Sequence, residues 1–382
     1  MIRPIQDLYN EYKHDICVVV PFGGMNHIRN AIDNIVHRYN NRIIVIDSAS
    51  EGNLTEQSFR DIHDKCDDSE IDCNKILLIQ SNYNLENQYE EFCNKNRIKA
   101  KINLCVTEHK LESSVESFNF IKNETWNFHE YDKRPNLNEW SDMKENREYY
   151  FISYNKTLRP DRVALLSLLY KEDLIKKGLV SIGSEEYGST GKQEWPNEFN
   201  FINDNLELIN GWSDKLRKLQ PLNVDGEPGV DTLDEGKNKG VNVCGYTYGD
   251  QFQRVYFMLL TEDVFNSESM FFSQTTYKPI VCLTPFIMFG SPYMMKNFVE
   301  VQGFKSFSPW IDESYDLEEN HEKRLLMIVE EMKRLCNMNI SEMDEWYFGM
   351  KDILIHNQNH LLNYPLDDYG IVKNKIEYLL SC

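Results

Sequence analysis

The sequence predicts an α/β protein with two Rossmann-like domains. Short apolar runs rich in β-branched residues alternate with stretches of helical spacing, which is the pattern of parallel sheets covered by helices. The pattern occurs on both sides of a segment rich in charges, and 41% hydrophobic residues in a chain of 382 suffice for two cores. We therefore expect a first domain over 1–125, a linker or crossover over 126–147, a second domain over 148–345 and a helical tail over 346–382.

Four apolar runs predict the strands of the first domain. The first run ends at the glycine turn Gly23-Gly24, and Ile28, Ile32 and Ile35 follow it at helical spacing. The last two runs are each followed by a segment that a helix could occupy, as parallel α/β structure requires. The predicted strands cover 15–21, 42–47, 75–80 and 101–106.

The second domain begins with the clearest unit of the chain. A strand over 148–153 leads through a short loop to Pro160, which suits the first turn of a helix. We expect that helix to end at Gly178 and a returning strand to cover 179–183. Further strands are predicted over 254–261 and 285–290, helices over 206–219, 321–337 and 346–363, the start of a helix within 276–283, and an exposed loop over 224–239.

The formal net charge is −20, from 41 Lys and Arg against 61 Asp and Glu. Such a field repels nucleic acids, membranes and phosphates across the surface as a whole, so a phosphate site needs a local cluster of cations. Lys156, Arg159 and Arg162 form such a cluster, because they follow a strand and lie at a helix start, where backbone amides attract an anion. Arginine forks suit a diphosphate. A solvated basic face is the alternative interpretation.

Polar side chains gather in two later segments. Residues 273–279 combine hydroxyls, an amide and one lysine, which suits a ribose or a phosphate, although Ser and Thr before a helix are commonly caps. Thr261-Glu262-Asp263 ends the preceding strand and adds two carboxylates. Glu262 is therefore a candidate ribose ligand or general base, and a solvated side chain is its simpler interpretation.

Cysteines, histidines and hydropathy bear on compartment and cofactors. The nine cysteines contain no C-x-x-C pair, and several lie in apolar runs, which is typical of a reducing compartment. The N-terminal residues lack a signal-peptide pattern, and no apolar run approaches the roughly 20 residues that span a bilayer, so we expect a cytoplasmic protein without membrane contact. His356 and His360 lie one helical turn apart without a third ligand nearby, so we expect no metal.

The order of these motifs resembles that of a known family. Between about residues 148 and 365, the chain is similar to an uncharacterised glycosyltransferase-like family common in phages and giant viruses. The pattern of that family runs N-x-x-x-R-P-x-R-x-x-L-L, T-E-T, T-E-K-T-x-K-P, P-F-I-x-x-G-x-P, G-F-K-T-F and D-E-S-Y-D. The matching segments here are Asn155 with Arg159-Pro160-Asp161-Arg162, Leu260-Thr261-Glu262-Asp263, 273–279, Pro285-Phe286-Ile287, 303–307 and 312–316.

The resemblance implies a fold and an activity. The layout is similar to the donor half of fucosyltransferases, in which an arginine turn and a T-E-K segment grip the nucleotide sugar. It implies a glycosyltransferase with two Rossmann-like domains facing a cleft, a GT-B-like architecture, and the chain's lack of an Asp-x-Asp triplet favours this two-domain, metal-independent type. The implied donor-binding residues are Tyr154, Asn155, Lys156, Arg159, Arg162, Thr261, Gln274, Thr275, Thr276 and Lys278.

A glycosyl transfer needs cations for the leaving diphosphate and a base for the acceptor hydroxyl. We expect Arg159, Arg162 and Lys278 to stabilise the diphosphate of the nucleotide sugar. The first domain is expected to position the acceptor, a glycan or a protein, with a modified DNA base as the alternative in a virus. The candidate bases are Asp47, Glu108, His109 and His27 at the strand ends of the first domain and Glu262 on the donor side, and the sequence does not choose among them.

One departure from the family pattern affects the donor site. Gln274 and Thr275 replace its Glu-Lys pair, which removes an acid that could hold a ribose and a cation that could neutralise phosphate. Either a different nucleotide or sugar is bound, or the chain is a non-catalytic nucleotide- or glycan-binding relative. The first interpretation predicts a hexosyl- or pentosyltransferase that needs no cofactor and works in the cytoplasm, that of a host cell if the protein is viral.

Overall fold

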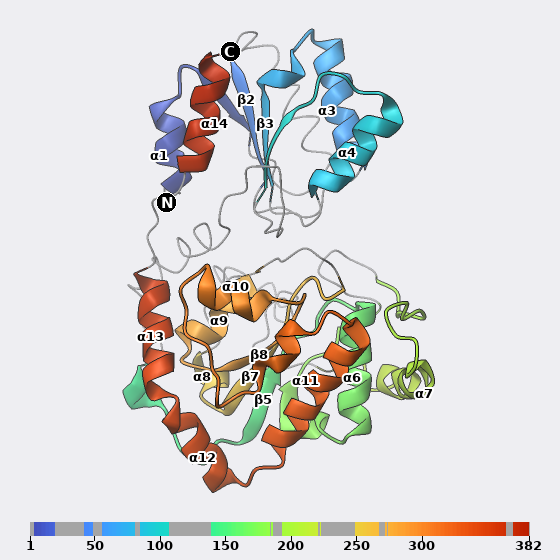
Figure 1. Ribbon diagram of the computed structural model, residues 1–382, viewed down its shortest axis with the longest axis vertical. Helices are drawn as coiled ribbons and strands as arrows, with labels where there is room; N and C mark the ends of the chain where they lie inside the picture. The colour runs from blue at the N-terminus through green and yellow to red at the C-terminus, as the bar shows by residue number, and fades with distance from the viewer. Residues whose placement is uncertain are drawn as a thin grey trace, which may run out of the picture. The chain divides into compact units, whose positions relative to one another are not determined.

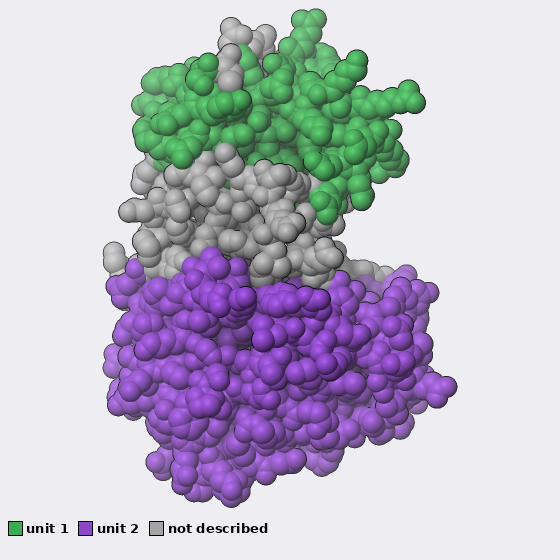
Figure 2. Space-filling model, in the orientation of Figure 1, with its two compact units in different colours: residues 1–126, 365–382 green, residues 127–364 purple. Residues whose placement is uncertain are grey.

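The computed structural model has an α/β fold with two sheets of parallel strands. It describes residues 4–19, 42–48, 56–80, 85–106, 139–183, 185, 193–220, 222, 249–266, 272, 274–363 and 370–381. The chain divides into two compact units, each shown in its own colour in Figure 2. Unit 1 comprises 1–126 and 365–382, and unit 2 comprises 127–364.

The sheet of unit 1 has four parallel strands in the order β1-β2-β3-β4. They lie in the four apolar runs from which strands are predicted, because β-branched residues favour extended backbone and pack well on a sheet. Ile44 and Ile46 of the second strand join the core on one face, and Val45 joins the core on the other. The strands are β1 (Ile16–Val19), β2 (Ile43–Ser48), β3 (Ile76–Gln80) and β4 (Asn103–Val106).

Helices cover both faces of this sheet, as Figure 1 shows. α3 (Glu56–Asp68) and α4 (Leu85–Asn96) connect successive strands and bury Phe59 and its neighbours against one face. Right-handed crossovers place the connecting helices on the same side when strands follow one another in chain order. The opposite face is covered by α1 (Pro4–Glu11) and α14 (Gly370–Ser381).

The last helix of the chain belongs to the first unit. Within the region expected to form a helical tail, 346–382, α13 (Lys351–Leu362) lies in unit 2, whereas α14 packs in unit 1. Val372 and Ile376, one helical turn apart on α14, are fully buried in the core that contains Val45. An amphipathic pattern does not indicate which apolar surface a helix covers, so the sequence does not reveal this return to the first sheet.

The sheet of unit 2 is also parallel, but its strands follow the order β6-β5-β7-β8. The chain runs outward from β5 to β6, crosses back over β5, and continues from β7 to β8. This reversal creates a topological switch point between β5 and β7, where open α/β sheets bind ligands at the carboxyl ends of their strands. The strands are β5 (Tyr149–Ser153), β6 (Gly178–Val180), β7 (Val255–Thr261) and β8 (Phe286–Phe289).

Helices cover both faces of the second sheet as well. Besides α13, the helices that the structure describes in unit 2 are α6 (Pro160–Lys171), α7 (Leu206–Arg217), α8 (Gly249–Phe252), α9 (Gln274–Val281), α10 (Met294–Glu300), α11 (His321–Cys336) and α12 (Ile340–Gly349). Short 3-10 turns are η1 (Cys73–Lys75) in unit 1 and η2 (Trp140–Asp142), η3 (Ile175–Lys177) and η5 (Glu313–Leu317) in unit 2. α6 packs with α7 and α11 on one side, and α9 packs with α13 on the other (Figure 1). Crossovers that leave a switch point in opposite directions place their helices on opposite faces.

The helix α6 begins at Pro160, as predicted, but ends earlier than expected. It ends at Lys171 rather than at Gly178, which instead begins β6. Asp173 adopts the left-handed conformation, with φ 58°, in the position after a helix that glycine usually takes. The predicted turn Gly23-Gly24, the helix expected after it and the loop expected over 224–239 lie outside the described residues.

Candidate functional site

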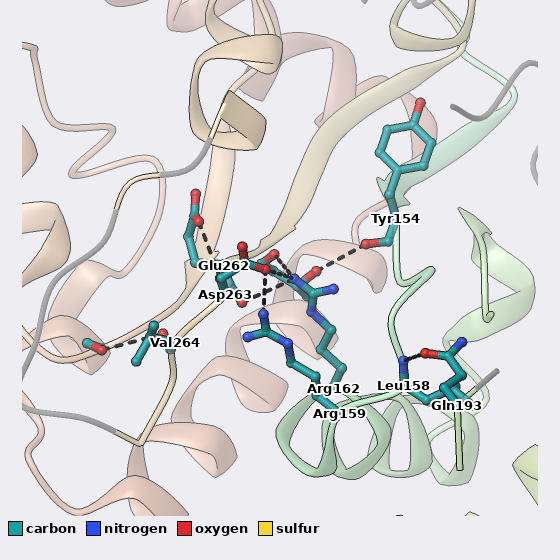
Figure 3. A network of polar contacts seen from close by, with 10 residues as sticks. Tyr154, Leu158, Arg159, Arg162, Gln193, Glu262, Asp263 and Val264 are labelled. Carbon is teal, nitrogen blue, oxygen red and sulfur yellow. Dashed lines mark hydrogen bonds and ion pairs between the residues drawn. The ribbon is translucent and has the colours of Figure 1, made fainter. Parts of the chain in front are cut away.

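The loops that leave β5 and β7 meet at the switch point of unit 2. The Thr261 Oγ1 hydroxyl, at the end of β7, donates a hydrogen bond of 3.2 Å to the carbonyl oxygen of Tyr154, just after β5. Both loops leave the carboxyl ends of neighbouring parallel strands, so they share one edge of the sheet. Figure 3 shows that Arg159 and Arg162, which follow β5, lie together there with Glu262 and Asp263, which follow β7.

Arg159, Arg162 and Asp263 form an ionic network at this edge (Figure 3). The Arg159 Nη2 atom lies 2.7 Å, and the Arg162 Nη2 atom 3.1 Å, from the same oxygen, Oδ1 of Asp263. Two of the three predicted cations are thus brought together, and a carboxylate of the same chain contacts both. Two guanidinium groups at a helix start can bind an anion through charge-assisted hydrogen bonds.

The start of α6 explains why the two arginines converge. Arg159 is the N-cap residue, and Pro160 occupies the first turn, where its missing N–H is not needed. The helix is apolar around its circumference and buried from Asp161 to Leu169, so the Arg162 side chain is carried inward and is only 9% exposed. The amide dipoles at this end favour a negative charge beside the guanidinium groups.

Burial perturbs the charged groups at the start of α6. Burial lowers the pKa of Arg162, and the neighbouring Arg159 lowers it further, whereas the carboxylates around it raise it. Burial also raises the pKa of Asp161. Among the described residues, Arg162 Nε, Asp161 Oδ2 and Asn155 Oδ1 are buried without a hydrogen-bond partner. Buried polar atoms are nearly always paired, so this group is one that a polar ligand would satisfy.

The backbone of the β5–α6 loop is held by Gln193, Ser181 and Gly183, which lie outside the motifs that predict the site. Gln193 Nε2 donates to the Lys156 carbonyl oxygen at 3.0 Å, and Gln193 Oε1 accepts from the backbone N–H of Leu158 at 2.9 Å. The Ser181 hydroxyl accepts from the Asn155 N–H at 3.0 Å. At Gly183 a Cβ atom would lie 1.8 Å from the Lys156 carbonyl oxygen, so glycine is required. Of the three, only Gly183 carries a sequence signal, because glycine at a strand end indicates a close backbone approach.

Glu262 and Thr276 tie the end of β7 to α9. The Thr276 hydroxyl donates a hydrogen bond to Glu262 Oε1, and neither side chain has exposed surface. Gly290, at the end of β8, lies beside this pair, and a Cβ there would be 3.5 Å from Glu262 Cβ. Glu262 is therefore not the solvated side chain of the simpler interpretation, and its carboxylate stabilises the start of α9.

The remaining predicted donor-site residues lie on the same loops or on α9. The Tyr154 hydroxyl donates a hydrogen bond of 2.5 Å to Oε1 of Gln251 on α8. Lys156 is half-buried in the β5–α6 loop. On α9, Thr275 is half-buried and Lys278 is 8% exposed. The side chain of Gln274 lies outside the described residues.

The general bases predicted in the first domain are described only in part. Asp47, near the end of β2, is buried and accepts a hydrogen bond of 2.9 Å from the Tyr9 hydroxyl. The Asp47 side chain therefore lies between the first sheet and α1, the helix that carries Tyr9. Glu108, His109 and His27 lie outside the described residues.

Two further sequence features concern metals and membranes. The rings of His356 and His360 stack with centroids 5.9 Å apart, and His360 Nε2 lies 2.8 Å from the Gln302 carbonyl oxygen. In the parts of the chain that the structure describes, no three His, Cys, Asp or Glu side chains group as a metal site needs. None of the described helices has the length and apolar character to cross a membrane.

Comparison with protein-family models, with curated proteins and with solved structures finds no significant match to the chain. The resemblance of the second half to a glycosyltransferase-like family thus stays a prediction that rests on its motifs.

Proposed function

We propose that the protein is a glycosyltransferase whose unit 2 binds a nucleotide-activated sugar. The observation that carries this proposal is the pair Arg159 and Arg162, whose guanidinium groups converge on one oxygen at the switch point of the sheet. Two forked cations beside a helix N-terminus suit a diphosphate better than an uncharged ligand. The order of motifs in the second half supports the same class of ligand.

The proposed architecture has two Rossmann-like domains that face a cleft, with unit 1 positioning the acceptor hydroxyl. As the bond between sugar and diphosphate breaks, negative charge develops on the departing diphosphate, and Arg159, Arg162 and Lys278 stabilise it. A base accepts the proton of the acceptor hydroxyl while the glycosidic bond forms. The proposed alternatives for that base are Asp47, Glu108, His109 and His27 in unit 1 and Glu262 in unit 2. The proposed acceptor is a glycan or protein, or a modified DNA base.

A second candidate function is a non-catalytic nucleotide- or glycan-binding protein with the same fold. Gln274 and Thr275 favour it, because the glycosyltransferase-like family that the second half resembles has an acid and a cation at these two positions. Donor hydrolysis and sugar transfer across a broad acceptor panel distinguish the two candidates. Binding of nucleotide sugars without either reaction would favour the non-catalytic protein.

The binding proposal is tested by thermal unfolding in the presence of a panel of nucleotides and nucleotide sugars. A ligand at about 100 times its Kd stabilises the folded state by about 2.7 kcal/mol, so a donor raises the melting temperature. We expect Arg159→Ala to abolish that increase. The matched control is Arg254→Ala, which removes another 2.7 Å arginine–carboxylate contact, with Glu148, at the start of the same two strands.

Two results would count against the proposal. If no nucleotide or nucleotide sugar raises the melting temperature of the wild type, the donor site is not supported. If Arg254→Ala removes the ligand effect as completely as Arg159→Ala does, the effect is one of general charge or stability rather than of a site at α6.

A further inference from the structure

One carboxylate oxygen joins the two arginines of the candidate site. Oδ1 of Asp263 lies 2.7 Å from Arg159 Nη2 and 3.1 Å from Arg162 Nη2, which are the distances of charge-assisted hydrogen bonds. A phosphate oxygen bound between two guanidinium groups would have the same neighbours. Figure 3 shows the Asp263 carboxylate beside both guanidinium groups, so it takes the contacts that such a phosphate oxygen would make.

Arg162 is held more firmly than Asp263. Its side chain is 9% exposed, and its Nη2 atom also donates to the carbonyl oxygens of Thr261 and Glu262, at 3.0 and 3.3 Å. The Asp263 side chain is 40% exposed. Separation of these ions therefore turns the acid outward, where water can solvate it, and leaves the arginine in place.

An uncompensated arginine at this position is unfavourable, because a buried charge without a partner is strongly destabilising. Arg162 Nε is buried without a hydrogen-bond partner among the described residues, and α6 has no side-chain hydrogen bond at its N-cap. The helix start accordingly keeps its attraction for anions when Asp263 leaves. Departure of the acid is thus favourable only when another anion takes its place.

We propose that Asp263 is an internal counter-ion that occupies the anion site of the unliganded protein and is displaced by the phosphate groups of the ligand. The identity of that ligand, a nucleoside diphosphate sugar, rests on the proposed function. Because displacement exchanges one anion for another, a singly charged anion gains little from it. A diphosphate brings additional negative charge to the two arginines, so Asp263 makes the site selective for diphosphates over monoanions.

The experiment titrates inorganic pyrophosphate into the full-length wild type and into Asp263→Asn by calorimetry. We expect Asp263→Asn to bind pyrophosphate at least about tenfold more tightly, since no charge-assisted contact has to be broken first. Glu148→Gln, which removes one negative charge at the opposite end of the same strands, is expected to bind as the wild type does. Arg159→Ala in the Asp263→Asn background is expected to lose the gain.

Equal or weaker binding by Asp263→Asn would overturn the proposal, because an acid that merely orients the arginines would help binding. Failure of both wild type and variant to bind pyrophosphate would overturn it as well. If Asp263→Asn does not fold, a crystal structure of the wild type with pyrophosphate decides: a phosphate oxygen between the guanidinium groups and Asp263 turned away supports displacement. Asp263 still on both arginines contradicts it.

These results separate the two proposals. Tighter pyrophosphate binding by Asp263→Asn without binding of any nucleotide sugar supports displacement and contradicts the glycosyltransferase function. Binding of a nucleotide sugar without the gain in Asp263→Asn contradicts displacement and leaves the proposed function standing.

Discussion

Gly183 and Gly211 show how differently one residue type acts at two positions. At Gly183 an added Cβ meets the Lys156 carbonyl oxygen at 1.8 Å, whereas at Gly211, inside α7, it meets no atom within 4 Å. We expect Gly183→Ala to destabilise the protein by about 1–3 kcal/mol or more, because backbone has to move. Gly211→Ala is expected to stabilise it by about 0.5–1 kcal/mol, because alanine favours the helix. Urea unfolding measures both changes.

An unaffected Gly183→Ala would show that the β5–α6 loop is not packed as described, and a destabilised Gly211→Ala would show that the space beside α7 at that position is not open. The loop also carries Arg159, so Gly183→Ala is further expected to weaken pyrophosphate binding, whereas Gly211→Ala leaves it unchanged.

Single residues of the candidate site could be predicted only where local sequence sets their position. Arg159 and Arg162 are recognisable because they follow a strand and begin a helix. That Asp263 faces them could not be predicted, because this contact spans about a hundred positions and depends on β5 and β7 being neighbours. Gln193 lies outside any motif, and its role follows only from the path of the loop that its amide contacts.

The thiol of Cys73, at the start of η1, is ionised more easily than an ordinary cysteine thiol. The Cys66 thiol donates a hydrogen bond to Cys73, and His63 Nδ1 lies 3.4 Å from Cys73 Sγ. Against the effect of burial, the hydrogen bond from Cys66 and the contact with His63 lower the pKa of Cys73 to about 5. An unfolded thiol titrates near pH 8.5, so the folded state binds fewer protons between these values.

The contribution of Cys73 to stability therefore rises with pH between about 5 and 8.5 and is lost as pH falls through 5. The difference in unfolding free energy between wild type and Cys73→Ser is expected to grow over this window, by at most about 1.4 kcal/mol per pH unit. Cys336→Ser is the control, because burial raises the pKa of Cys336 to about 12, so its thiol stays protonated in both states up to about pH 7.5, below the range in which an unfolded thiol titrates. Parallel profiles for the two variants, from urea unfolding at each pH, would contradict the ionised state of Cys73.

Elements were predictable where their side chains alone determine them. The strands of both sheets follow from apolar, β-branched runs, and the start of α6 follows from Pro160. The end of α6 was mispredicted, because the left-handed residue that closes it is Asp173 and not a glycine. Aspartate tolerates that conformation but signals it weakly in a sequence, so Gly178 was the stronger and misleading indication.

At the scale of the whole molecule, the sequence predicts parallel α/β structure in both halves but not the strand orders. Unit 1 has the consecutive order β1-β2-β3-β4, and unit 2 has the reversed order β6-β5-β7-β8. Both orders come from the same alternation of strands and helices, so periodicity does not distinguish them. The difference matters for function, because within the described strands only the second sheet has a switch point, and the arginine pair lies at it.

The consecutive order of the first sheet also makes unit 1 dependent on the end of the chain. The described crossover helices, α3 and α4, share one face, and α1 and α14 cover the other, where Ile376 is fully buried and Tyr378 is 59% exposed. We expect Ile376→Ala to destabilise unit 1 by about 3 kcal/mol, because it leaves a cavity against the sheet. Tyr378→Ala, on the same helix, is expected to have little effect.

Hydrogen exchange followed by mass spectrometry measures this prediction unit by unit. A loss of about 3 kcal/mol speeds exchange that occurs through unfolding of unit 1 by about 100-fold, so peptides from β2 and β3 are expected to lose protection in Ile376→Ala. Peptides from β5 and β7 are expected to keep theirs, because the described contacts of Ile376 belong to the core of unit 1. Equal loss of protection in both units would mean that the two unfold together, and unchanged protection in β2 and β3 would mean that α14 does not stabilise the sheet it covers.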